Sequence, residues 1–248
     1  MIKSYSYSNN SFRMVLHKTT AIICVLFIVS CSSIYDKQPN IKATSPNNFT
    51  TTKFTTDKSV TTKQQQNDSI FVNLKEYSTD FVYDLKYATT DNFLNQKVYD
   101  CDECYLRLRT VNSLIKANND FIAKGYRIKL FDCYRPIDVQ KKMWEIVSNP
   151  NYVADPKKGS IHNRGGAIDI TLVDFNGKEL DMGTSFDHFG IESSHDYQSL
   201  STEVLNNRKL LKEIMLKNNF KAFDSEWWHY NLKEANLFNL SNFKWNCK

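Results

Sequence analysis

Two segments far apart in the chain contain the residue types of a catalytic metal site. The first, residues 159–169, has His162 and Asp169 on either side of a Gly-Gly pair, and the second has Glu226 three residues before His229. A catalytic zinc ion takes three protein ligands, keeps one position for water and works beside a carboxylate that accepts a proton from that water. Two imidazoles and two carboxylates meet this need. The sequence therefore predicts a zinc site with one carboxylate left over as the base.

The Gly-Gly pair explains how two residues well separated in sequence could face one ion. His162 and Asp169 are too far apart for one helical turn and have the wrong parity for one face of a strand. Gly165 and Gly166 permit a sharp turn between them. We therefore expect His162 on a loop and Asp169 on the strand that follows, both directed at the same point.

Glu226 and Arg135 are the candidates for catalysis. On a regular strand Glu226 and His229 would face opposite sides, so we expect Glu226 at the turn before the strand, reaching over the metal as a base and not as a ligand. Arg135 follows an expected strand, and its planar charge suits the oxyanion of a tetrahedral transition state. The alternatives are a surface ion pair for the glutamate, and for the arginine a structural pair with Asp132 or Asp138.

The spacing of apolar residues predicts the elements that position these side chains. Helical periodicity covers residues 105–124, 137–148 and 203–218, and strand patterns cover 126–132, 167–172 and 227–232. The order has no regular βαβ repeat and no glycine-rich phosphate loop. With 41% hydrophobic and 24% charged residues, the composition is that of a folded protein. We expect one α+β domain with a small, mainly antiparallel sheet packed by helices.

The N-terminal region has the pattern of a secretory signal. Residues 21–30 are apolar, too short to span a bilayer and preceded by basic residues. They end at Ser30-Cys31, which resembles the bacterial lipobox, in which the cysteine is acylated and becomes the mature N-terminus. An uncleaved anchor is the alternative, and Met14 could be the true start.

These features predict the organisation of the whole chain. We expect a lipoprotein signal peptide at 1–30, a disordered polar tether at 31–69 and a catalytic domain at 70–248, because the tether is too polar to offset its ordering entropy. Ser32 after the lipidated Cys31 predicts sorting to the periplasmic face of the outer membrane in a double-membraned bacterium. The membrane is thus an expected partner, through the lipid.

The charge distribution and the cysteine spacing argue against a nucleic-acid partner and against a second metal site. The net charge of +5 is spread along the chain without a basic, aromatic-rich block, so no nucleic-acid partner is expected. Nothing in the sequence predicts an oligomeric state. Cys101 and Cys104 have the spacing of half a zinc knuckle but lack a second close pair, so a local disulfide or free thiols are expected in preference to a metal. The pairing of these two with Cys133 and Cys247 is left open.

Taken together, the motifs resemble a known family. The relevant segments are Ser160-Ile-His-Asn-Arg-Gly-Gly-Ala-Ile-Asp169, Glu226-Trp-Trp-His-Tyr230, residues 84–93, Tyr134-Arg135-Pro136, residues 182–187 and Asn207-Arg208. They resemble the zinc-dependent D-alanyl-D-alanine dipeptidases over about residues 71–232. The Ser-His-Asp signature is shared with D,D-carboxypeptidases and other cell-wall peptidases, whereas the 84–93 block and the doubled tryptophan favour the dipeptidases.

The resemblance implies a role for each site residue. It implies that His162, Asp169 and His229 bind one zinc ion, that Glu226 is the catalytic base and acid, that Arg135 stabilises the transition state, and that Ser160, Tyr87 and Asp187 line the substrate pocket. The implied reaction is hydrolysis of the D,D-dipeptide D-Ala-D-Ala to free D-alanine. The alternatives are a D,D-carboxypeptidase that trims peptidoglycan stem peptides and a non-catalytic, zinc-containing lipoprotein that binds the cell wall.

One position departs from the family pattern. Cys133 stands where relatives commonly have glycine before Tyr-Arg-Pro. A residue with a side chain restricts the turn that glycine would allow. The placement of Arg135, two residues later, could therefore differ from that in the relatives.

Overall fold

The computed structural model describes residues 67–247, and this part of the chain has the expected α+β architecture. The predicted signal peptide, the predicted lipidation of Cys31 and nearly all of the predicted polar tether lie outside the described residues. Within the described range, no helix combines the length and the apolar character needed to cross a bilayer.

The main sheet has five strands and is mainly antiparallel, as predicted. Its order is β2 (Val82–Tyr83), β4 (Tyr126–Asp132), β5 (Ala167–Asp174), β7 (Glu226–Leu232) and β6 (Phe220–Phe223). Only the β2–β4 pair is parallel. A separate antiparallel pair joins β1 (Phe71–Asn73) to β3 (Tyr105–Arg107).

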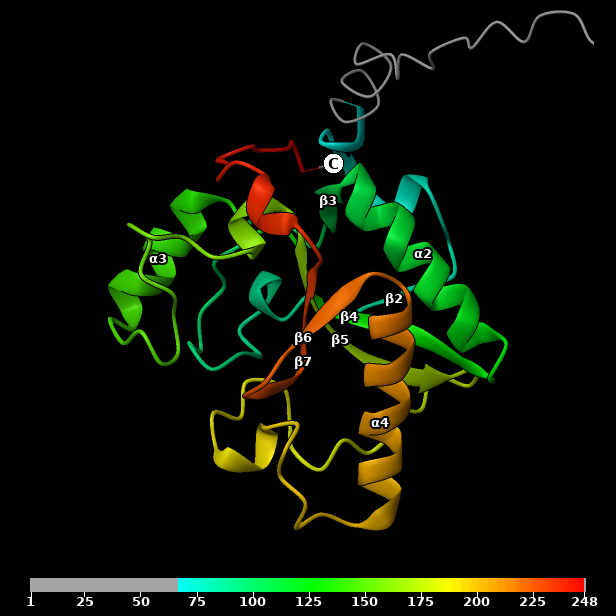
Figure 1. Cartoon of the computed structure of the whole chain (residues 1–248). Coiled ribbons are helices and arrows are strands. Elements are labelled where there is room, and N and C mark those ends of the chain that lie inside the picture. Colours follow the sequence, from blue (N-terminus) through cyan, green and yellow to red (C-terminus); the bar gives the residue numbers. More distant parts are fainter. Residues whose placement is uncertain (1–66, 248) are drawn as a thin grey trace, which may run out of the picture. The chain divides into compact units, whose positions relative to one another are not determined.

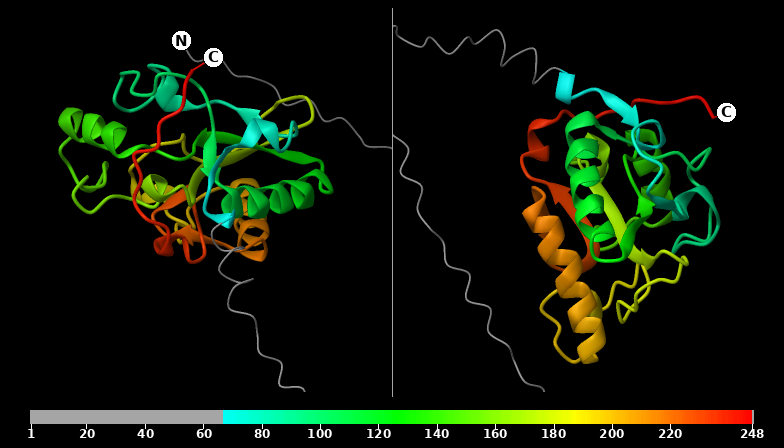
Figure 2. Two further views of the ribbon diagram at one scale, coloured as in Figure 1. Left: turned by 90° about the horizontal axis from the view of Figure 1, so that it is seen from above. Right: turned by 90° about the vertical axis from the view of Figure 1, so that its right-hand side faces the viewer.

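The described part of the chain has three α-helices: α2 (Leu108–Ile122), α3 (Ile137–Ile146) and α4 (Thr202–Lys217). Figures 1 and 2 show α2 and α4 together on one side of the main sheet, with α3 standing apart from them. The short 3-10 helices are η1 (Leu74–Glu76), η2 (Lys86–Ala88), η3 (His162–Arg164), η4 (Ile191–Ser193) and η5 (Ala235–Leu237).

The central strands β4 and β5 are apolar where they cross the core and polar where they approach the site. Leu130, Ile168 and Ile170 are fully buried in the main hydrophobic cluster. The β4–β5 register shifts after Leu130, and the next pair brings Asp132 opposite Asp169. This end of the sheet therefore concentrates carboxylates beside a rigid apolar core.

Two sequence predictions need correction at the edges of elements. The helix expected from residue 105 begins at Leu108, because residues 105–107 form β3, with Leu106 buried against β1. Strand β6 was not predicted, although Phe220 and Ala222 alternate with exposed neighbours in the manner of an edge strand. Its pairing with β7 forms the hairpin that carries Glu226.

The expectation of a local disulfide or free thiols is wrong. The structure contains disulfides Cys101–Cys247 and Cys104–Cys133, so the two neighbouring cysteines take different, distant partners. Cys104 is fully buried and faces the end of β4. Cys101 instead meets the C-terminal segment, whose Trp245 stacks on Tyr105. Tertiary packing, not spacing in the sequence, decides these pairings.

Candidate active site

The eight residues predicted for the site surround one cavity of about 430 Å³. They come from η2, the loop after β4, the loop that leads into η3, η3 itself, β5, the loop before η4, and β7. The residues are Tyr87, Arg135, Ser160, His162, Asp169, Asp187, Glu226 and His229. Long-range folding has therefore brought together all the side chains that the sequence predicted for catalysis, metal binding and substrate binding.

Three of these side chains converge on a single point. His162 Nε2 lies 3.2 Å from His229 Nδ1 and 3.4 Å from an Asp169 carboxylate oxygen, and His229 Nδ1 lies 2.9 Å from the other oxygen. One ligand atom from each residue falls within 4.8 Å of the others. Burial would raise the pKa of Asp169, but the charges and hydrogen bonds of the two histidines hold it well below its usual range. The group offers a charged carboxylate and two imidazoles to one cation.

Hydrogen bonds on the far side of each imidazole fix which nitrogen faces that point. His162 Nδ1 donates to the Cys133 carbonyl oxygen at 2.7 Å, which leaves the Nε2 lone pair for the site. His229 Nε2 donates to Asn231 Oδ1 at 3.0 Å, which leaves its Nδ1 lone pair for the site. Metal-binding histidines characteristically donate their second N–H in this way. All three converging atoms are therefore acceptors, as metal ligands must be.

Glycine is required at positions 165 and 166 for two different structural reasons. Gly165 ends η3 with φ of 75°, in the left-handed region, and a Cβ there would meet Phe71. A Cβ on Gly166 would lie 2.4 Å from that of Ala235. The chain thus turns within two residues, and β5 begins at Ala167 with Asp169 directly opposite His229. The predicted placement of His162 before the strand and Asp169 on it agrees with this geometry.

Glu226 reaches the site by a route that differs from the prediction. It is the first residue of β7 and not part of the turn before it. The β6–β7 register shifts between Ala222 and Phe223, so that Phe223 pairs with Glu226. This irregularity breaks the strict alternation of faces. As a result Glu226 and His229 lie on the same side, with 3.8 Å between a carboxylate oxygen and Nδ1.

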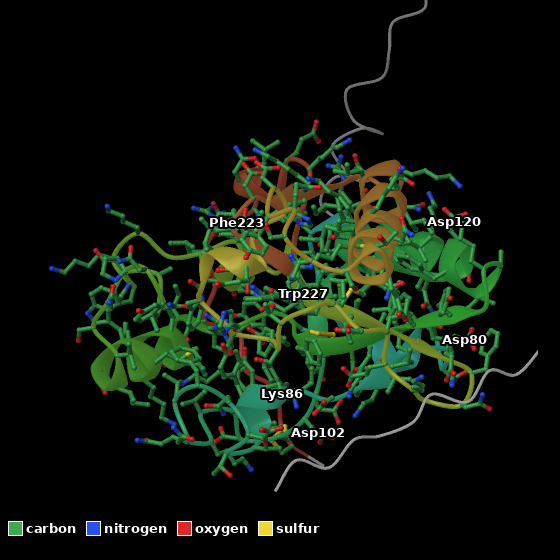
Figure 3. The ribbon with its side chains drawn as sticks, turned by 90° about the horizontal axis from the view of Figure 1, so that it is seen from below. Asp80, Lys86, Asp102, Asp120, Phe223 and Trp227 are labelled. Carbon is green, nitrogen blue, oxygen red and sulfur yellow. A yellow bond between two sulfur atoms is a disulfide. The ribbon has the colours of Figure 1, made fainter. Side chains whose placement is uncertain are left out.

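The environment of Glu226 raises the pKa of its carboxyl group. Burial, together with the negative charge of Asp169, raises the pKa of Glu226 above its usual value. Figure 3 labels Phe223 and Trp227, the residues that flank this part of the hairpin. Trp227 is buried and donates from Nε1 to Thr184 Oγ1 at 2.8 Å, which ties the hairpin to the loop beside it.

Arg135 both lines the cavity and forms the structural ion pair that the sequence offered as an alternative. Its guanidinium donates to Asp132 at 2.5 Å and to Gln140 Oε1 at 3.1 Å, and it lies over the Tyr87 ring. Asp132 also accepts from the Tyr99 hydroxyl at 2.6 Å. Burial would lower the pKa of Arg135, but the Asp132 charge raises it well above the usual value. The cation is therefore permanent and fixed in place.

The three predicted pocket residues, Tyr87, Asp187 and Ser160, all line the cavity. The Tyr87 hydroxyl donates to Asp187 Oδ2 at 2.9 Å, and burial and the Asp169 charge raise the pKa of Asp187 well above its usual value. Asp187 has φ of 59°, a conformation that aspartate tolerates better than most residues. Ser160 precedes η3, with its N–H and hydroxyl both directed to Asn163 Oδ1.

Several residues of the site were missed by the sequence reasoning. Asn231 follows His229 by two positions, which on a strand means the same face, and this was an available signal. Asn163 is fully buried and donates to the Arg135 carbonyl oxygen at 2.8 Å. Tyr152 and Phe189 also line the cavity, with 4.8 Å between the centroids of their tilted rings, and no sequence pattern indicated them.

Comparison with known proteins agrees with this geometry. A family model described as "D-ala-D-ala dipeptidase", Peptidase_M15, matches residues 67–245. The chain is 36% identical to a D-alanyl-D-alanine dipeptidase of Escherichia coli (strain K12) over 71% of this chain and 91% of that protein. Dipeptidases of the same description from Enterococcus faecium and Enterococcus faecalis (strain ATCC 700802 / V583) are 32% and 30% identical, over 61% and 65% of this chain and 86% and 91% of theirs. The chain therefore belongs to the Peptidase_M15 family of D-Ala-D-Ala dipeptidases and is a metallopeptidase.

Proposed function

We propose that this protein hydrolyses D-alanyl-D-alanine to two molecules of D-alanine in a zinc-dependent reaction. The observation that carries the proposal is the convergence of three acceptor atoms, a carboxylate at 3.8 Å from one of them and a fixed guanidinium on one small cavity. The names of the similar dipeptidases support the choice of substrate.

The donor set fits zinc. Two imidazole nitrogens and one carboxylate are a common ligand set of catalytic zinc, which leaves a further position for water. His162, Asp169 and His229 would hold the ion, with Cys133 and Asn231 orienting the two rings. When bound, the ion lowers the pKa of water and polarises a carbonyl group.

Glu226 is the base and then the acid of the proposed reaction. It accepts a proton from the attacking water as the water oxygen bonds to the peptide carbonyl carbon. It then delivers that proton to the amine nitrogen as the C–N bond breaks, which gives a carboxylic acid and an amine. Transfer of the acid's remaining proton to the amine leaves a carboxylate and an ammonium group. The raised pKa of Glu226 suits a group that must both take and return a proton near neutral pH.

Arg135 stabilises the negative charge that develops on the carbonyl oxygen. Its guanidinium is held by Asp132 and Gln140 before any substrate enters, so little reorganisation is needed during the reaction. A preorganised donor of this kind typically contributes about 10²–10³-fold in rate.

The cavity suits a short zwitterion. Asp187 and Tyr87 would bind the substrate ammonium group, and Ser160 would lie beside the peptide. The Tyr152 and Phe189 rings add apolar surface to the lining and limit the space for a longer ligand. A longer peptide would have to bury polar groups without partners, which costs affinity.

We further propose that the chain is exported and lipid-anchored through Cys31, with residues 1–30 as the signal peptide and 31–69 as the tether to a domain at 70–248. Disulfides form and persist in oxidising compartments, so the two disulfides of the domain support export. At the periplasmic face of the outer membrane the substrate would be dipeptide released from the cell wall. Labelling with a fatty acid tests this: incorporation should be lost in Cys31→Ala, and unchanged incorporation would contradict it.

The decisive experiment compares two substrates on one preparation. Protein stripped with a chelator and refilled with zinc should release D-alanine from D-Ala-D-Ala and leave a pentapeptide ending in D-Ala-D-Ala nearly untouched. Preference for the pentapeptide would identify a D,D-carboxypeptidase. Zinc binding without turnover of either substrate would identify a non-catalytic cell-wall-binding protein, and activity that survives metal removal would contradict the mechanism.

A further inference from the structure

The Cys104–Cys133 disulfide is adjacent to residues that hold the predicted site side chains His162 and Arg135 in place. Both cysteines are buried. The Cys133 N–H donates to Asp132 Oδ1 at 2.9 Å, and the Cys133 carbonyl accepts from His162 Nδ1 at 2.7 Å. One residue therefore contacts, through its backbone, both the acid that holds Arg135 and one of the converging histidines.

The segment that contains Cys133 is not held by the main sheet. The β4–β5 register becomes irregular after Leu130, and β4 ends at Asp132. Cys104 precedes β3, in the smaller sheet, and its carbonyl accepts from the Leu74 N–H at 2.9 Å. The Tyr134 N–H donates to the Tyr105 carbonyl oxygen at 3.0 Å, so the disulfide and this hydrogen bond together join the segment after β4 to the smaller sheet.

We infer that the Cys104–Cys133 disulfide is a positioning element of the active site. It fixes the carbonyl that orients His162 and the backbone that carries Asp132, and so aims the His162 Nε2 lone pair and the Arg135 guanidinium into the cavity. The inference rests on the proposed zinc site, but not on the proposed substrate.

The second disulfide provides a matched control within the same chain. Cys101–Cys247 holds the C-terminal segment and, unlike Cys133, neither of its cysteines has a backbone hydrogen bond to a site residue within the described part of the chain. It closes a loop with a sequence separation of 146 residues, against 29 for Cys104–Cys133. In the chain-entropy model the longer loop contributes more to stability. If both disulfides acted on stability alone, removing the control pair Cys101–Cys247 should therefore cause the larger loss of stability.

The test measures zinc affinity and stability in three proteins. The wild type, Cys104→Ser/Cys133→Ser and Cys101→Ser/Cys247→Ser are titrated with zinc in competition with a chromophoric chelator, and their metal-free forms are melted. We expect the zinc Kd of the first double variant to rise about 10–100-fold, the range for loss of groups that orient metal ligands. The control variant should keep the wild-type zinc Kd, although its Tm should fall at least as much as the Tm of Cys104→Ser/Cys133→Ser. Equal Kd values in all three proteins would overturn the inference, as would an equal rise in both variants.

Kinetics give a second readout. At saturating zinc, displacement of Arg135 should lower kcat on D-Ala-D-Ala more than it raises KM, and the control pair should leave both unchanged. If the wild type fails to cleave the dipeptide, the proposed substrate is wrong but the zinc titration still decides the inference. If the serine variant does not fold, Cys104→Ala/Cys133→Ala is used, because alanine suits a fully buried apolar position.

Discussion

The two walls of the cavity are built in contrasting ways. The arginine wall, residues 132–135 with 160–164, is tied by buried hydrogen bonds: Asp132 and Asn163 are fully buried, and Arg135 is 7% exposed. The glutamate wall, residues 223–226 of the β6–β7 hairpin, is open to solvent on one side. Within the described residues, the ion-pair partner of the Glu226 carboxylate is His229, at 3.8 Å.

This difference matches what each wall has to do. A group that stabilises developing charge works best when it is already in place and does not move. A group that takes a proton from water and returns it to an amine must change charge and reach two positions. Under the proposed mechanism, the arginine wall supplies a charge that is fixed in place, whereas the glutamate wall leaves Glu226 free to transfer a proton between two positions.

Removing the base should give the largest effect. Glu226→Gln keeps the shape of the side chain and abolishes its basicity, so kcat should fall by about 10²–10⁴-fold. Zinc content, measured by atomic emission after dialysis, should stay at the wild-type level because Glu226 is not one of the three converging ligands. Loss of the metal along with activity would identify Glu226 as a ligand. The glutamate wall would then hold the metal and would not be the wall that transfers protons.

Removing the fixed cation should affect both rate and stability. Arg135→Met should lower kcat by about 10²–10³-fold, and it leaves Asp132 buried without its ion pair. Breaking a buried pair from one side typically costs about 3–5 kcal/mol. Urea unfolding should therefore show a large loss for Arg135→Met and little for Glu226→Gln. Equal stability of the two variants would show that the arginine wall is no more tightly built than the other.

The contrast also explains what the sequence could and could not predict. Ligand chemistry and the Gly-Gly pair were enough to identify His162, Asp169 and His229, because both signals are local. The side on which Glu226 lies depends on a register shift opposite Phe223, and the pairing rule for a regular strand placed Glu226 in the turn instead. Cys104 and Cys133 pair because β3 and the end of β4 meet in space. Contacts of this kind leave no periodic trace in the sequence.

A smaller effect is expected from the residue that orients His229. Asn231→Ala removes the acceptor of the His229 Nε2–H, so the tautomer with its lone pair on Nδ1 is no longer favoured. The zinc Kd should rise about 10–100-fold, and kcat at saturating zinc should change little. Asn231→Asp retains an acceptor oxygen and should restore most of the affinity. An unchanged Kd in Asn231→Ala would mean that strand pairing with Asp169 alone orients the ring.

The smallest expected effect is on the pH dependence of stability. Because burial raises the pKa of Glu226 in the folded, metal-free protein, the folded state holds this proton to higher pH than the unfolded state does. The stability contributed by Glu226 is therefore fully present below its unfolded pKa and is lost as pH rises through the folded pKa. Glu226→Gln has no such loss, so the metal-free variant should match the wild type in Tm at acidic pH and exceed it at neutral pH. A variant less stable than the wild type at neutral pH would show that the charged carboxylate is held by favourable contacts, and that the glutamate wall is as tightly organised as the arginine wall.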